Sequence, residues 1–230
     1  MITLSLSDIT WFLLLAARWT LLLSAIAFVG GTIGATLLML LRYGAPKTGR
    51  RFTTVYIQFF QGTPLLLQLF LIFFGLPMLG VEISPLLAAG VALTLYASAF
   101  LAEIWRGCVD AIPRGQWDAS ASLGLNFILR MRLVVLPQAL KIAVPPTVGF
   151  LVQLVKSTAL ASIVGFDELT KSAQIVANAT FEPLQVYGIA ALIYFAICFP
   201  LTIASRRLER HLQTQSHRAP RALPEGMTEA

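Results

Sequence analysis

Long apolar segments alternate with short polar gaps along this chain. Five such segments are present, and each is apolar nearly all round, which is typical of a membrane span rather than of a surface helix. They cover roughly Phe12 to Leu41, Val55 to Leu79, Pro85 to Trp105, Val134 to Val155 and Val186 to Ala204. The pattern predicts an all-α integral membrane protein with five transmembrane helices.

Two features predict departures from straight spans. The first segment is long enough to include an interfacial turn around Arg18 before the span itself. Prolines also lie within segments, and each removes a backbone donor and can kink its helix. They are Pro64, Pro145, Pro146 and Pro200. A purely structural kink is the simpler interpretation, and a broken helix in a moving part of a transporter is the other.

The basic residues fall in alternate gaps and so predict the orientation. The gaps after the first and third segments and the tail after the fifth are rich in Lys and Arg. The gap after the second segment has neither, and the long gap after the fourth has only Lys156 and Lys171. Because basic loops stay in the cytoplasm, the N-terminus is expected outside and the C-terminus in the cytoplasm.

The amino-acid composition is typical of a membrane protein and argues against nucleic-acid binding, a disulfide framework and a metal site. Apolar residues make up 57% and charged residues 12% of the chain, whereas a soluble domain carries about 25% charged residues. The net charge of +6 lies in the gaps, so it does not indicate nucleic-acid binding. Two cysteines give no disulfide framework, and both histidines, His211 and His217, lie in the tail. We therefore expect no metal site and no cofactor bound by this chain.

We expect one transmembrane domain over residues 1–214 and a polar, disordered tail over 215–230. The long fourth gap also predicts a short helix from Glu168 to about Asn178, capped by Asp167. One side of this helix is apolar, at Leu169, Ala173, Val176 and Ala177. Such a helix suits a gate or lid, and equally a simple interfacial helix.

The gap after the third segment contains the most informative stretch of the sequence. Pro113 and Gly115 break the chain, and a short helix is predicted over 116–125. Trp117, Ala121 and Leu125 fall on one face of it, and Gly124 can end it in the left-handed conformation. The residues between are small, which allows close approach of another protein. Periodicity alone also permits an amphipathic helix lying on the headgroups.

The order Asp118-Ala119-Ser120, then Gly124, then Val134-x-Leu136-Pro137 resembles the E-A-A…G…I-x-L-P loop of ATP-binding-cassette (ABC) importer permeases. Further segments are similar to the polar-amino-acid branch of that family. They are Gln61–Leu66, Ala102–Gly107, Ile112–Gln116 and Lys156–Ser162. The departures are Asp118 for Glu, Ser120 for Ala, Gln61 for Arg and Ala159 for Ser.

The resemblance implies the type I importer permease fold and a set of partners. These are ABC ATPase subunits that hold ATP and Mg²⁺, a second permease (an identical copy or a paralogue), an extracytoplasmic solute-binding protein and an amino-acid substrate. The 230 residues contain no Gly-x-x-x-x-Gly-Lys-Ser/Thr loop, so this chain is expected to be a transporter subunit rather than an enzyme. The location implied is the inner or plasma membrane of a prokaryote. The expected ATPase-coupling residues are Gln116, Asp118, Ala119, Ser120, Gly124 and Leu125.

Polar groups inside spans are costly and are candidate functional residues. Seven are candidates for lining a substrate path: Gln58, Gln61, Thr63, Gln68, Gln153, Lys156 and Ser157. Hydrogen bonding between helices is the alternative role for them. Glu103 and Arg106, three residues apart, are expected to form a structural pair, and pairing of Glu103 with a partner subunit is the alternative.

The favoured function is import of amino acids, or of related small amines or opines, by alternating access, driven by a separate ATPase and fed by a solute-binding protein. An ATP-independent secondary carrier or channel is the alternative, although it usually needs carboxylates in mid-membrane and only Glu103 comes near. A membrane enzyme or an assembly subunit is a third class. The absence of membrane histidines and of paired carboxylates argues against an enzyme.

Overall fold

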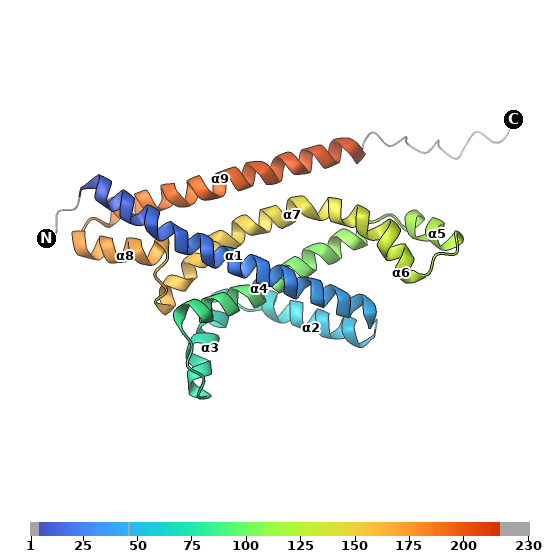
Figure 1. The fold of residues 1–230 in the computed structure, drawn as a ribbon, viewed down its shortest axis with the longest axis horizontal. Helices are drawn as coiled ribbons and strands as arrows, with labels where there is room; N and C mark the ends of the chain where they lie inside the picture. Colours follow the sequence, from blue (N-terminus) through green and yellow to red (C-terminus); the bar gives the residue numbers. More distant parts are fainter. Residues whose placement is uncertain (1–4, 46, 217–230) are drawn as a thin grey trace.

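The computed structural model describes residues 5–45 and 47–216, and all regular structure in these ranges is helical (Figure 1). The helices are α1 (Leu6–Gly44), α2 (Thr48–Gly62), α3 (Leu65–Met78), α4 (Pro85–Asp110), α5 (Arg114–Ser122), α6 (Phe127–Arg130), the π-helix η1 (Met131–Val135), α7 (Leu136–Ser157), the 3₁₀-helix η2 (Thr158–Val164), α8 (Leu169–Thr180) and α9 (Pro183–Ser216). Helices α5 and α6 lie at one end of the bundle, and α8 lies near the other end.

Helix α1 is continuous over 39 residues, so the turn expected around Arg18 is absent. The sequence around Arg18 is rich in Ala and Leu and has no Gly or Pro, which favours an unbroken helix. The Arg18 guanidinium lies 5.3 Å from the centre of the Trp19 ring, an arrangement that suits a cation beside an aromatic side chain. The helix starts with a capping box between Ser5 and Asp8.

The second apolar segment is not one straight span. It forms α2 and α3, which meet at Thr63 and Pro64 with a bend of 98°. In Figure 1, α3 projects away from the bundle. The proline lacks a backbone donor and disfavours a helical conformation of the residue before it, so the helix ends there. Within the described residues, four helices are long and apolar enough to span a membrane, and the bent pair would make a fifth.

Small residues bring α1 and α4 into close contact. A Cβ atom added to Gly31 would lie 2.5 Å from the Ala97 Cβ, and one added to Gly34 would lie 2.7 Å from the Ser98 Cβ. Both distances are shorter than real contacts allow. Glycine lets the two backbones pack directly, as at many helix interfaces in membranes. This interface joins α1 to the main core, which also includes residues of α2, α3, α4, α7 and η2.

The prolines in α7 and α9 do not divide these helices: Pro145 and Pro146 lie within α7, and Pro200 lies within α9. The fourth span is longer than predicted, because α6, η1, α7 and η2 continue it from Phe127 to Val164.

Helix α8 confirms the expected apolar side, since Leu169, Ala173, Val176 and Ala177 are all buried. The predicted cap is wrong by one residue. Glu168 is the N-cap, with an extended backbone, and its side chain accepts from the Lys171 amide. Asp167 is exposed. Glu168 takes the cap because it is the last non-helical residue, from which a side chain reaches the third amide of the helix.

Helix α9 continues to Ser216. The predicted disordered tail, 215–230, falls outside the described residues from position 217 onward.

Candidate functional site

The loop between α4 and α7 is built around α5. Helix α5 starts at Arg114 rather than Gln116, directly after Pro113. It ends as predicted at Gly124, which has a φ of +75°. The Gly124 amide donates to the Ala121 carbonyl (2.9 Å) and the Leu125 amide to the Ser120 carbonyl (3.3 Å). This is a Schellman ending, which suits glycine because the left-handed conformation costs it nothing.

The face of α5 on which the spacing places Trp117, Ala121 and Leu125 is only partly buried. Ser120 is buried and Trp117 half-buried, whereas Ala121 is exposed. Trp117 and Ala121 share α5, whereas Leu125 lies beyond Gly124, at which the helix ends. The Trp117 ring instead packs against a cluster that includes Val109, Ile112 and Met131, and this anchors α5 to α4 and η1.

The outer surface of the loop exposes apolar side chains. Leu123 is 80% exposed and Ile128 is 72% exposed, at the end of the molecule that carries α5 (Figure 1). Of the expected coupling residues, Gln116, Asp118, Ala119 and Gly124 are exposed and Leu125 is half-buried. Ser120 is buried, and its hydroxyl donates to the Trp117 carbonyl. Ser120 therefore stabilises α5 from within and is not part of its outer surface. The sequence analysis missed Leu123 and Ile128, because Leu123 falls outside the face of Trp117, Ala121 and Leu125, and Ile128 falls outside the predicted helix.

Arg106 holds two carboxylates near the same end of the bundle. Its Nε donates to Glu103 Oε2 (2.8 Å), and its terminal nitrogens pair with Glu103 and Asp110. The pair expected from the sequence is therefore present as a triad. Asp110 was missed, although its spacing of four residues from Arg106 is a helical pairing distance.

The candidate path residues on α2 and α3 separate into two kinds. Gln58 and Gln61 are exposed. Gln68 is buried, and its Nε2 donates to the Phe60 carbonyl (2.9 Å) and to the Thr63 carbonyl (3.0 Å) and hydroxyl (2.8 Å). It therefore braces the bend between α2 and α3 and does not line an open path. The Thr63 hydroxyl also donates to the Phe59 carbonyl.

The second polar group lies on α7. Gln153 and Lys156 are exposed, whereas Ser157 is buried and donates to the Gln153 carbonyl (3.0 Å). Helix α4 packs against both α2 and α7, while α2 and α7 are not among the helix pairs with extensive contact in the described residues. The structure thus does not bring the exposed glutamines of α2 directly against the α7 group within one chain.

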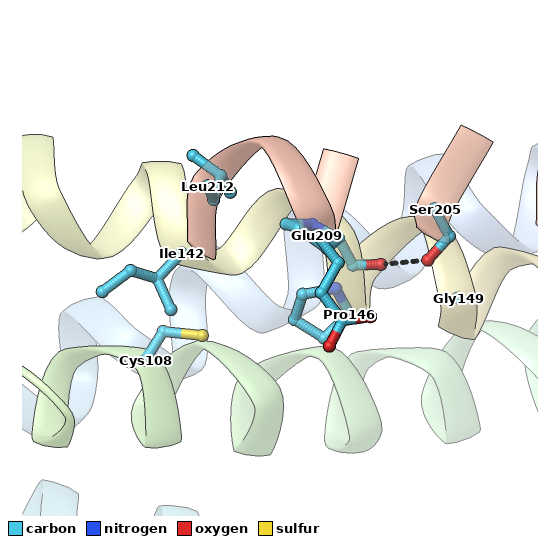
Figure 2. Close-up of a pocket in the computed structure, with 8 residues that line it drawn as sticks. Cys108, Ile142, Pro146, Gly149, Ser205, Glu209 and Leu212 are labelled. Carbon is cyan, nitrogen blue, oxygen red and sulfur yellow. Dashed lines mark hydrogen bonds between the residues drawn. The ribbon is translucent and has the colours of Figure 1, made fainter. Parts of the chain in front are cut away.

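A cavity of about 480 Å³ lies between α4, α7 and α9 (Figure 2). Cys108, Pro146, Ser205 and Glu209 are among its lining residues, and the Ser205 hydroxyl donates to the Pro145 carbonyl (2.9 Å). That bond ties α9 to α7 beside the two prolines. None of the candidate path residues lines this cavity, so it is not the site that the sequence predicted.

A bundle of helices that are long and apolar enough to span a membrane, with a short exposed helix between two of them, is the architecture of a multi-pass membrane protein. Residues 27–214 match the family model "Binding-protein-dependent transport system inner membrane component". The chain belongs to this family, which confirms the resemblance found in the sequence.

Proteins similar to this chain include permeases of ABC transporters for amino acids. The chain is 35% identical over 192 residues to the probable amino-acid ABC transporter permease protein YckA of Bacillus subtilis (strain 168), covering 84% of this chain and 85% of the relative. It is 34% identical over 195 residues to the L-cystine transport system permease protein TcyB of the same organism, covering 84% and 83%. A crystal structure of an amino acid ABC transporter with histidines superposes with a TM-score of 0.85 at 31% identity, covering 91% of this chain and all of that one. The protein is thus a permease component of an amino-acid ABC importer family.

Proposed function

We propose that this chain is the transmembrane permease subunit of an ABC importer that moves amino acids, or related small amines or opines, into the cytoplasm by alternating access. The observation that carries the proposal is the exposed pair Leu123 and Ile128 on a loop that is internally well fixed. A rigid element with unpaired apolar side chains at the end of a bundle suits a protein partner. We assign that partner as the ABC ATPase, which holds ATP and Mg²⁺.

Force on α5 would reach the spans through short connections. Pro113 joins α5 to α4, and α6 and η1 join it to α7. Trp117 couples it to both sides through one cluster. A displacement of α5 by ATP binding is therefore transmitted to α4 and α7, which pack against each other in the bundle. Under the positive-inside rule this end is cytoplasmic, with α8 on the outer side.

The exposed polar side chains of the spans are the best candidates for the substrate path. Gln58, Gln61, Gln153 and Lys156 are exposed in the single chain. Polar groups at membrane depth are tolerated where they face protein or a water-filled cavity rather than lipid. We infer that they face a path completed by a second permease, identical or paralogous. A solute-binding protein would deliver the amino acid from outside, and a prokaryotic inner or plasma membrane is the location.

The coupling role is tested by Leu123→Glu, with Leu184→Glu as its matched control. Leu123 is 80% exposed beside α5 and Leu184 is 90% exposed at the opposite end, so neither change disturbs the core. A charge placed in an apolar contact weakens binding by 2 kcal/mol or more, which is more than tenfold in Kd. We expect Leu123→Glu to lose the ATPase in a binding assay and Leu184→Glu to keep it. Equal binding by both variants would contradict the assignment.

A further inference from the structure

Glu168 is a fully buried carboxylate that plays no part in the function proposed above. Its exposed fraction is 0%, and it is the N-cap of α8. Among the described residues no cationic side chain forms an ion pair with Glu168, so its carboxylate is buried without a cationic partner. Burying an unpaired carboxylate is costly unless several donors stabilise it. Hydrogen-bond donors around the carboxylate must therefore stabilise it.

Donors from three helices surround this carboxylate. Glu168 Oε2 accepts from the Tyr194 hydroxyl of α9 (2.8 Å) and from the Thr20 hydroxyl of α1 (3.2 Å). Glu168 Oε1 accepts from the Lys171 amide in the first turn of α8 (2.9 Å). The positive end of the α8 dipole also favours a negative charge at this position.

The two hydroxyls belong to a longer chain of hydrogen bonds. The Leu169 amide donates to the Thr20 hydroxyl (3.1 Å), so α1 caps the first amide of α8. The Tyr194 hydroxyl lies 2.9 Å from the Thr170 hydroxyl. Since Tyr194 has one hydrogen and gives it to the carboxylate, Thr170 is the donor in that contact. Chains of this kind polarise each bond and rigidify the groups that form them.

Local capping does not account for this arrangement. Asn, Asp, Ser and Thr are the preferred N-cap residues, and a cap needs a contact only with the first turn of its own helix. Glu168 instead extends to two other helices while still accepting from its own first turn. Apolar contacts join the same three helices. One buried cluster includes Leu13 of α1, Leu169 and Val176 of α8, and Val186 and Ile193 of α9. Helix α8 is therefore held on both sides and is not a free lid.

We propose that Glu168, Thr20 and Tyr194 form a clamp that holds α8 in a single position on α1 and α9, with Glu168 as a positioning residue for transport. The role of Glu168 in transport rests on the proposed function. In the proposed orientation, α8 forms part of the outer surface that a binding protein meets, and the clamp keeps that surface in one geometry. The connection that precedes the clamp has Gly165 in the left-handed conformation (φ +84°), so α8 is oriented by the clamp rather than by a continuous helix.

Glu168→Asp separates the clamp from the cap. Aspartate keeps the charge and caps α8, but it is one methylene shorter and cannot reach Thr20 and Tyr194 together. Tyr194→Phe removes one donor with little change in shape and serves as a milder second variant. Tyr187→Phe is the matched control, because Tyr187 lies on the same helix and is exposed. The first readout is hydrogen–deuterium exchange of the α8 amides in nanodiscs, which does not depend on transport.

A lost hydrogen bond to a charged group corresponds to about a tenfold increase in local opening. We expect α8 exchange to rise by about that factor in Tyr194→Phe and by at least that factor in Glu168→Asp, and to stay unchanged in Tyr187→Phe and throughout α4. Uptake stimulated by the binding protein should fall in the same two variants while basal ATPase activity is kept. Unchanged α8 exchange would overturn the clamp, and raised exchange with full uptake would overturn its role in transport. If the wild type itself shows no uptake, the proposed function fails and the exchange data still decide the clamp.

Discussion

Single residues set the closest contacts of this fold. Gly31 and Gly34 allow α1 and α4 to meet, and at both positions a Cβ atom would overlap the other helix. The sequence shows glycines in an apolar span, but it does not show which of them face another helix. Gly30 and Gly31 contact α4, whereas Gly188 in α9 has open space around it. That distinction depends on helix rotation, which an evenly apolar span does not encode.

Gly31→Ala should therefore destabilise the protein. The added Cβ would lie 2.5 Å from the Ala97 Cβ and 3.2 Å from the Ala97 carbonyl carbon, so the helices must separate. Overpacking of this kind costs about 1–3 kcal/mol. We expect a lower Tm in detergent by thermal melting. Gly188→Ala, with nothing within 4 Å, should melt as the wild type does. A Gly31→Ala variant with an unchanged Tm would show that α1 and α4 are not in this contact.

At the scale of elements, the apolar pattern predicted which segments are helical. Most differences between prediction and structure lie where a helix starts, ends or bends. The break at Pro64 was expected as a kink, but a bend of 98° also needs a partner for the backbone groups it exposes. Gln68 supplies it, through bonds that no periodicity reveals. The predicted cap of α8 and the predicted start of α5 at Gln116 both differ from the structure for the same reason, because the exact residue at which a helix starts depends on local contacts.

Gln68→Leu tests the brace between α2 and α3. The change leaves the Phe60 and Thr63 carbonyls without the hydrogen bonds that Gln68 donates. Each buried group left without a partner destabilises the bend by about 1–3 kcal/mol. We expect a broader distribution of distances between spin labels at Arg51 and Met78, both exposed, by double electron–electron resonance. Gln58→Leu, at an exposed position of α2, is the control and should keep the wild-type distribution. A narrow distribution in Gln68→Leu would mean that Pro64 alone fixes the bend.

At the scale of the whole molecule, the type of protein was predictable because the motifs of the α4–α7 loop and the charge pattern agree. The number of membrane crossings could not be predicted, because the bent pair α2 and α3 either crosses the membrane or returns to the same side.

We predict that α2 and α3 together cross the membrane. In a variant with Cys108 and Cys198 replaced by alanine, Glu82→Cys should react with an impermeant maleimide in intact cells. Arg51→Cys should react only after permeabilisation, and equal protection of both would indicate a re-entrant pair.

ATP-driven uptake into proteoliposomes is the most direct test of the assigned function. The permease is reconstituted with its ATPase and binding protein, and radiolabelled amino acids are followed with ATP on the ATPase side. We predict accumulation that requires ATP, the ATPase and the binding protein together, and that is abolished by Leu123→Glu. Accumulation driven by an ion gradient in the absence of the ATPase would contradict this function and identify the protein as an ATP-independent carrier.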